Sequence, residues 1–121
     1  MFYTQSQLVS FFAPILNKEF KFKNFILKTY KAGMTVNELI DKSKLSRTSF
    51  YKLFQAEFGQ TAKQWMIAKQ VDAIRTKLKD HHLSLKDIMF DTGFDNPSQF
   101  TRFCKSNLND TPTNLLKMFR D

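Results

Sequence analysis

The feature that most limits what this chain can fold into is an internal repeat of about fifty residues. Apolar positions of one stretch return later at a nearly constant separation. Val36, Leu39 and Leu45 match Leu85, Ile88 and Phe94 at an offset of 49, and Phe50, Leu53, Phe54, Phe58 and Thr61 match Phe100, Phe103, Cys104, Leu108 and Thr111 at an offset of 50. The step from 49 to 50 indicates one inserted residue in the second copy. The repeat predicts two similar structural units within one chain.

The first copy has the pattern of two short helices joined by a tight turn. Thr35 is a favourable N-cap, and Glu38 stands three residues later, which is the capping-box spacing. Ser46 offers a second N-cap, and Gly59 is placed to end the helix that follows. Two short helices arranged in this way predict a helix-turn-helix unit.

The second copy repeats this pattern. Ser84 and Asp87 have the capping spacing, and Gly93 lies in the turn that follows. Either Asp95 or Asn96 caps the next helix, because both residue types favour the N-cap position. The second copy therefore predicts a second helix-turn-helix unit.

Helical spacing of apolar residues predicts three more helices outside the repeat. They are a basic helix over 18–32, a linker helix over 61–79 whose apolar stripe is Trp65, Ala68, Val71, Ile74 and Leu78, and a short closing helix over 112–119. The predicted fold is all-α, with about seven helices and two helix-turn-helix units joined by a long linker helix. The expected parts are an uncharged N-terminal segment 1–17, a first helix-turn-helix subdomain 18–59, a linker helix 60–80 and a second helix-turn-helix subdomain 81–121.

Composition supports a helical protein with a polyanionic partner. The 121 residues include 14 Phe but only 3 Gly and 3 Pro, which favours helices with short turns and a substantial apolar core. The net charge is +8, distributed as +6 over residues 18–52, +2 over 53–80 and zero over 81–121. We therefore expect the first unit to supply most of the attraction to a polyanion.

The N-terminal segment and the single cysteine bear on location. Cys104 has no partner for an internal disulfide, and residues 1–17 lack the Lys or Arg that precede the apolar stretch of a signal peptide. The apolar run 8–16 is too short to span a bilayer. We expect a cytoplasmic protein, associated with the nucleoid if it binds DNA.

Residues 34–120 resemble the DNA-binding domain of the AraC/XylS transcription regulators. The most specific part is DIMFDTGFDNPSQFTRFCKSNLNDTP, residues 87–112, and LSRTSFYKLFQAEFGQT in the first copy also fits. Three positions depart from the family pattern: Cys104 stands where an aromatic residue is usual, Asn109 where Gly is usual, and Gln70 where Arg is often found. Asn109 still permits the left-handed conformation that ends a helix.

The resemblance implies a sequence-specific regulator that binds double-stranded DNA. Its two recognition helices would enter successive major-groove segments about 34 Å apart on one face of the duplex. It also implies activation through contact with RNA polymerase, although repression stays open.

Candidate contact residues follow from the outward positions of the two recognition helices. Lys52 suits guanine, Gln99 suits a bidentate pair with adenine, and Arg102 suits guanine or a phosphate. The predicted base contacts are Thr48, Tyr51, Lys52, Ser98, Gln99 and Arg102. The predicted phosphate contacts are Thr35, Ser46, Arg47, Ser84, Asn96 and Lys105, several of them at helix N-termini.

Other classes of function remain as alternatives. The chain has no Ser/His/Asp set, no spacing of metal ligands and no glycine-rich phosphate loop, so neither an enzyme nor a cofactor is expected. His81 and His82 have no third ligand nearby, and Cys104 falls in the apolar stripe, where a buried, unreactive thiol is expected. The remaining alternatives are a non-specific basic DNA-binding protein and a protein-interaction or membrane-surface module that uses residues 1–17.

The oligomeric state follows from the same reasoning. We expect a monomer on DNA, or a dimer formed through residues 1–17 or through a domain outside this chain. The chain is then either a small stand-alone regulator or the C-terminal part of a larger one. Residues 1–17 are expected to pack on the helix over 18–32.

Overall fold

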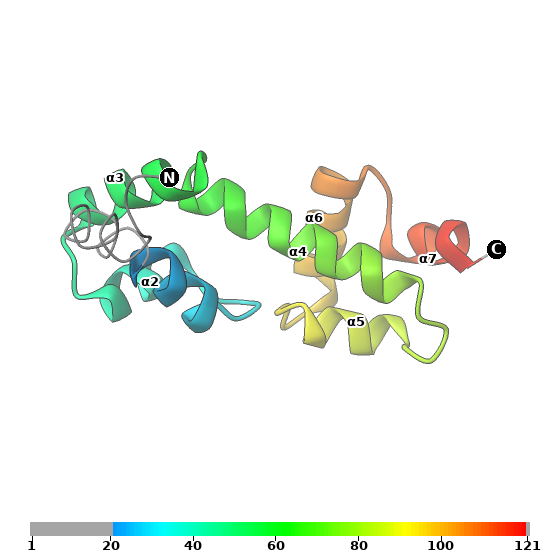
Figure 1. The fold of residues 1–121 in the computed structure, drawn as a ribbon. Helices are drawn as coiled ribbons and strands as arrows, with labels where there is room; N and C mark the ends of the chain where they lie inside the picture. The colour runs from blue at the N-terminus through cyan, green and yellow to red at the C-terminus, as the bar shows by residue number, and fades with distance from the viewer. Residues whose placement is uncertain (1–20, 121) are drawn as a thin grey trace, which may run out of the picture. The chain divides into compact units, whose positions relative to one another are not determined.

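Helices account for all the regular structure of residues 21–120, which are the residues that the computed structural model describes (Figure 1). A helix covers 21–29, and six more follow: α2 (Val36–Ser43), α3 (Arg47–Phe58), α4 (Ala62–Leu78), α5 (Leu85–Asp91), α6 (Pro97–Leu108) and α7 (Pro112–Arg120). The prediction of an all-α fold with about seven helices is confirmed over this range. The expected packing of residues 1–17 lies outside the described residues.

The chain forms two units. The first contains the described residues up to Tyr30 together with Val36–Ala62, and the second contains Lys31–Thr35 and the chain from Lys63 onward. Each unit holds one of the two predicted helix-turn-helix pairs, α2 with α3 and α5 with α6. No helix within 21–120 combines the length and the apolar character needed to cross a bilayer.

Phenylalanine rings form much of the core of the first unit. Phe22 meets Phe50 edge to face at 5.5 Å between ring centroids and meets Phe54 at 6.1 Å, while Phe58 stacks on Phe54 at 4.3 Å. The edge-to-face geometry of the first two pairs is one that aromatic rings prefer, and the third pair is a close stack. Ile26, together with residues of α2, is buried in the same unit. The apolar stripe predicted for α3 is therefore the buried side of that helix.

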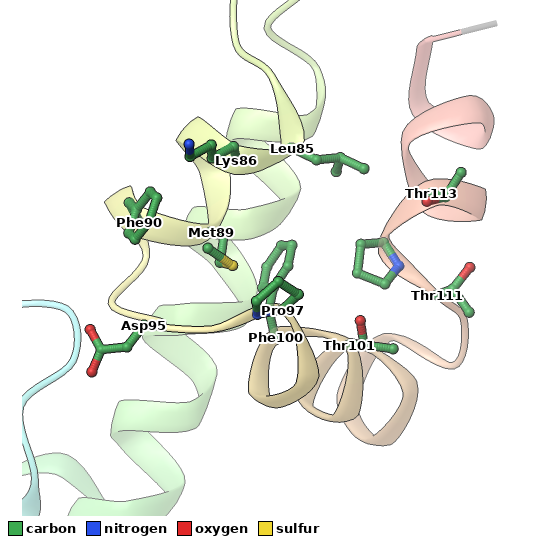
Figure 2. A pocket seen from close by; sticks show the side chains of 11 residues that line it. Leu85, Lys86, Met89, Phe90, Asp95, Pro97, Phe100, Thr101, Thr111 and Thr113 are labelled. Carbon is green, nitrogen blue, oxygen red and sulfur yellow. The ribbon is translucent and has the colours of Figure 1, made fainter.

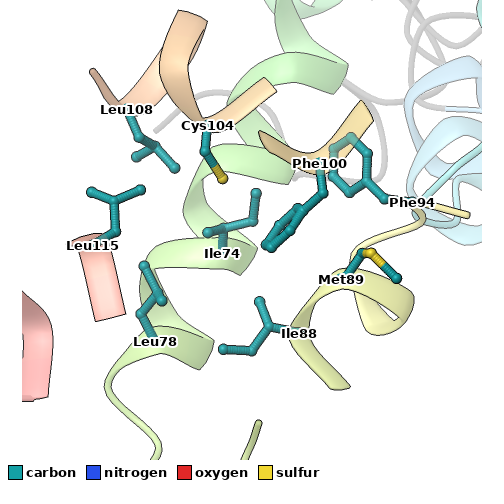
Figure 3. Close-up of a cluster of buried hydrophobic side chains, with 9 residues drawn as sticks. All are labelled: Ile74, Leu78, Ile88, Met89, Phe94, Phe100, Cys104, Leu108 and Leu115. Carbon is teal, nitrogen blue, oxygen red and sulfur yellow. The ribbon is translucent and has the colours of Figure 1, made fainter. Parts of the chain in front are cut away.

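Nine buried side chains form the core of the second unit, and all four of its helices contribute to it (Figure 3). They are Ile74, Leu78, Ile88, Met89, Phe94, Phe100, Cys104, Leu108 and Leu115. Val71 packs against this cluster, as the predicted stripe of the linker helix requires. The assignment of Ala68 to that stripe is wrong, because Ala68 is exposed. At about 100° per residue, Ala68 is rotated roughly 120° around the helix axis from Ile74.

The ends of the helices follow the turn chemistry of the sequence. Ser84 and Asp87 form the predicted capping box: the Ser84 hydroxyl accepts from the Asp87 amide at 3.1 Å, and the Asp87 carboxylate accepts from the Ser84 amide at 2.9 Å. At the C-termini of α3 and α6, Gly59 and Asn109 both adopt the left-handed conformation, with φ of 69° and 67°. Asn109 therefore ends α6 in the same conformation in which Gly59 ends α3.

Two glycines of the second unit make a close backbone contact. Gly33 and Gly93 both have φ of +92°, and a Cβ added to Gly93 would lie 2.5 Å from the Cα of Gly33. Any side chain at Gly93 would thus collide with the backbone of the segment Lys31–Thr35. The helix over 21–29 ends before this segment, three residues earlier than predicted.

Two polar side chains that the sequence did not single out for this role bond main-chain carbonyls near helix ends of the second unit. Arg120 donates to three main-chain carbonyls, those of Leu78 at 2.9 Å, Asp80 at 2.6 Å and Leu83 at 2.7 Å. Thr92 is fully buried, and its hydroxyl donates to the carbonyl of Ile88 at 2.6 Å. The Arg120 bonds supply donors to carbonyls at and after the end of α4, where intrahelical donors run out. The Thr92 hydroxyl adds a second donor to the Ile88 carbonyl, which also accepts from the Thr92 amide at 3.0 Å.

Candidate nucleic-acid interface

The N-terminus of α3 is organised by Ser46. Its hydroxyl accepts from the Ser49 amide at 3.1 Å, so the backbone adopts the extended conformation at Ser46 and turns helical at Arg47. The first amides of a helix have no intrahelical partner, and this cap uses only that of Ser49. The amides of Arg47 and Thr48 therefore point out of a helix end that carries partial positive charge, which suits a phosphate group.

The outward face of α3 carries the predicted base-contact residues of the first unit. Thr48, Tyr51 and Lys52 are all exposed, whereas Phe50 and Phe54 on the opposite side are fully buried. Burial of the two rings fixes the rotation of the helix about its axis. The fold thereby presents the three polar side chains to solvent together, as an entering recognition helix requires.

Arg47, a predicted phosphate contact, is held by a residue that sequence reasoning missed. Its guanidinium donates to the side-chain oxygen of Asn37 at 2.9 Å. Asn37 lies on α2, ten residues earlier, and the sequence contains no local spacing signal that pairs two residues on different helices. The bond orders the long Arg47 side chain in advance, which lowers the entropy lost when it binds an anion.

The N-terminus of α6 uses a different cap. Asn96, and not Asp95, is the N-cap, because its side-chain oxygen accepts from the Gln99 amide at 2.9 Å. Pro97 occupies the first helical position and has no amide hydrogen. Among the first three helical residues, Pro97 has no amide hydrogen and the Gln99 amide is bound by the cap, which leaves the Ser98 amide for an external partner. This helix end therefore offers one amide donor, whereas the end of α3 offers two.

The outward face of α6 brings several predicted contacts together. Ser98, Arg102 and Lys105 line one shallow hollow along the helix with Pro97 and Thr101, since they recur at the spacing of successive helical turns. Gln99 is exposed as well but does not line this hollow. Ser98, Arg102 and Lys105 thus occupy one accessible side of α6, and Gln99 is exposed beside it.

The remaining two phosphate candidates stand at the first helices of the two pairs. Thr35 is exposed and directly precedes α2. Ser84 caps α5, but the Asp87 carboxylate occupies that helix end, and the hydrogen bond from the Ser84 amide lowers the pKa of Asp87 below its ordinary value. A negative charge at this position opposes a phosphate, so Ser84 stays a prediction with an unfavourable electrostatic environment.

Groups with catalytic or metal-binding chemistry are not gathered at this surface. Cys104 is buried in the core of the second unit, and burial raises the pKa of its thiol to about 11. His81 and His82 are exposed, and within 21–120 no three His, Cys, Asp or Glu residues are grouped so that they would hold a metal ion. An uncharged thiol in an apolar core is a poor nucleophile.

Comparison with known proteins places this geometry in a family. Residues 32–118 match the helix-turn-helix domain family. The chain belongs to this family and, within it, to the AraC/XylS type. This is a family of DNA-binding domains of transcription regulators and not of enzymes.

Curated relatives include known regulators of operons. The chain is 30% identical over 76 residues to the melibiose operon regulatory protein of Escherichia coli. This matched stretch covers 63% of this chain and 25% of that protein. The chain is 29% identical to the transcriptional activator NphR of a Rhodococcus species, covering 69% and 24% of the two chains. The chain thus spans about a quarter of the length of these relatives.

Solved structures share the fold. The C-terminal domain of the two-component response regulator YesN from Fusobacterium nucleatum has a TM-score of 0.68 at 22% identity and covers 83% of this chain and 98% of its own. A protein of unknown function from Listeria innocua has a TM-score of 0.65 at 20% identity and covers 88% and 99%. At this level of identity, the two structures support the architecture alone.

Proposed function

We propose that this chain is the DNA-binding part of a transcription regulator that recognises a specific operator with two recognition helices, α3 and α6. The observation that carries the proposal is that both helices have the same organisation. Each has one face buried in an apolar core, a side-chain cap at its N-terminus and an exposed polar face that holds predicted contacts. Each is thus suited to enter one major-groove segment.

The two helices differ in how they would bind. The α3 end has two amides for phosphates and the ordered Arg47 beside them, with Lys52 on the outer face. The α6 end has the amide of Ser98, with Gln99 and Arg102 as base-reading side chains. We expect α3 to contribute more to affinity and α6 to depend more on the base sequence.

Several finer points belong to the same proposal. The functional parts are those given by the sequence, with boundaries at 18–59, 60–80 and 81–121. The protein acts in the cytoplasm at the nucleoid and activates transcription through contact with RNA polymerase. One chain occupies a bipartite site, either as a monomer or as half of a dimer held outside residues 18–121.

Selection of bound duplexes from a random pool tests the proposal. We expect a bipartite motif whose two conserved segments are centred one helical turn of DNA apart. Gln99→Ala is expected to relax base preference in one segment, and Thr48→Ala in the other, because each removes contacts on one helix. The matched control is Thr76→Ala, an exposed threonine on α4 that is not a predicted contact.

Two results would contradict the proposal. Enrichment of no motif, with binding that depends only on salt, would indicate the non-specific basic protein that stands as the alternative. A single enriched segment altered by only one of the two variants would mean that one helix alone reads bases.

A further inference from the structure

The second unit contains a hollow that the proposed DNA contacts do not use. It has a volume of about 720 Å³ and lies between α5, the start of α6 and the start of α7 (Figure 2). This volume falls within the range of about 300–1,000 Å³ that is usual for small-molecule sites.

The lining of the hollow is largely apolar and aromatic. Met89 and Phe100 are buried, with 6% and 3% of their surfaces exposed, and they form its inner wall, while Phe90 is 52% exposed at its edge. Phenyl rings and a thioether sulfur both make favourable contacts with aromatic rings. An occupant with a planar aromatic skeleton would therefore gain more than an aliphatic one.

The polar groups around the hollow favour an occupant without net charge. Lys86 and Asp95 both line it, both are exposed, and their charges are opposite. In Figure 2 the Asp95 carboxylate points away from Met89 and Phe100. Hydroxyl groups on the α6 and α7 side, those of Thr101 and Thr113, offer hydrogen bonds without charge.

From these features we infer that the second unit binds an uncharged aromatic small molecule between α5, α6 and α7. The site also borders the DNA-reading face, because Pro97 and Thr101 line both this hollow and the one that holds Arg102 and Lys105. If α6 reads DNA as proposed above, an occupant in contact with Thr101 alters the affinity of α6 for DNA. This second statement rests on the proposed function, whereas the first does not.

The binding site is tested on the full chain without DNA, with N-phenyl-1-naphthylamine as the probe. This uncharged amine, which carries a naphthyl and a phenyl group, becomes fluorescent in apolar surroundings. We expect saturable binding at one site per chain. Removal of the aromatic edge in Phe90→Ala, or filling of the hollow in Thr113→Trp, is expected to weaken binding about tenfold. Phe90 is 52% exposed, and Thr113 is exposed in the first turn of α7. Both variants are therefore expected to fold, which circular dichroism checks.

The matched control is Met118→Ala on α7. Met118 is 66% exposed and does not line the hollow, so its removal deletes an exposed apolar side chain of the same unit without touching the site. Equal dye binding by all four proteins, or no saturable binding, would overturn the inference. The anionic analogue of the dye is 8-anilino-1-naphthalenesulfonate. If it binds more tightly than the uncharged dye, and Lys86→Gln removes that difference, the assignment of an uncharged ligand is overturned.

A final measurement separates the inference from the proposed function. The affinity for a selected duplex is measured over a range of dye concentrations. We expect a change of about tenfold or more at saturation, and we expect Phe90→Ala to need about tenfold more dye to reach it. Dye binding with no change in DNA affinity would overturn the coupling to α6. Failure of DNA binding itself would contradict the proposed function and leave the dye result intact.

Discussion

At the scale of single residues, three departures from the family pattern are explained by what surrounds them. Cys104 replaces an aromatic residue but is fully buried in the second core, so the position keeps its apolar role. Asn109 replaces glycine and adopts φ of 67°, which asparagine tolerates better than most residues. Gln70 replaces arginine and donates to the carbonyl of Thr92 at 3.2 Å, which ties α4 to the end of α5.

Cys104 predicts an alkaline limit on stability. Its folded pKa of about 11 lies above its ordinary value of 9.0 because of burial. A pKa raised by folding contributes stability that is complete below the ordinary value and is lost as the pH rises from 9 toward 11. We expect a loss of about 2–3 kcal/mol across this window from this thiol.

Urea unfolding at several pH values between 8 and 11 measures this effect. Cys104→Ala is the control, because it has no thiol and should show a shallower decline with pH. Parallel curves for the two proteins would rule out the explanation.

At the scale of elements, polar residues fix where helices of the second unit begin or end. The capping box at Ser84 begins α5 and Asn96 begins α6. The Arg120 guanidinium of α7 binds the carbonyl of Leu78 at the end of α4 and two carbonyls that follow it. Such bonds supply partners for the backbone groups that every helix end leaves unpaired.

The capping box predicts an acid limit on stability. Ser84→Ala should destabilise the chain by about 1 kcal/mol, because it removes an N-cap. The lowered pKa of Asp87 means that its contribution is present above the ordinary carboxyl pKa and is lost as the pH falls through the folded value. Asp87→Asn is therefore expected to flatten the acid side of the stability curve.

The same unfolding experiment, repeated between pH 2 and 6, checks both variants. Ser106→Ala, an exposed serine inside α6, should leave stability nearly unchanged. An Asp87→Asn protein as sensitive to acid as the wild type would assign the acid limit to other carboxylates, such as Asp80 and Asp110, whose pKa values are also lowered by hydrogen bonds.

Arg120 predicts a larger effect than a surface charge normally has. Arg120→Ala removes three hydrogen bonds from a charged donor, so we expect a loss of about 2–3 kcal/mol. Arg120→Lys should recover part of it, because one ammonium group cannot reach all three carbonyls with the geometry of a guanidinium. Lys117→Ala, exposed on the same helix, is the control. A loss no greater than that of the control would show that the three bonds do not stabilise the fold.

At the scale of the whole molecule, charge is distributed unevenly along the chain. Residues 18–52 carry +6, whereas 81–121 are neutral. The second unit also commits Arg120 to its own backbone, which leaves fewer basic groups for a phosphate backbone. The first unit is therefore expected to dominate the electrostatic part of DNA binding.

Neutralising one basic residue on each recognition helix tests this ranking. Lys52→Gln should weaken binding more than Arg102→Gln and should reduce the slope of log affinity against log salt by about 0.9, the value for one phosphate contact. Lys69→Gln, on the exposed side of α4, serves as the control. If Arg102→Gln alone removes most binding and flattens the salt dependence, the ranking is wrong.

The sequence by itself determined the helices, most of their caps and the two helix-turn-helix units, because these depend on interactions among residues close in the chain. It left the N-cap of α6 open between Asp95 and Asn96, and the structure selects Asn96. Ser84 and Asn96 cap helices through bonds to nearby residues, and Asn109 ends α6 through its own backbone conformation. The apolar repeat indicates which helix face is buried. The sequence also predicted the candidate contact residues, which the fold leaves exposed, most of them on or directly before α3 and α6.

Only the tertiary structure decided the contacts between residues far apart in the chain. Asn37 with Arg47, Gln70 with Thr92, and Arg120 with the carbonyls after α4 have no spacing signal, since their geometry depends on how whole helices pack. The hollow beside α6 is of the same kind, because its walls come from three helices. The repeat thus specified two helix-turn-helix units, and packing alone created the hydrogen bond between Asn37 and Arg47 and the space beside α6.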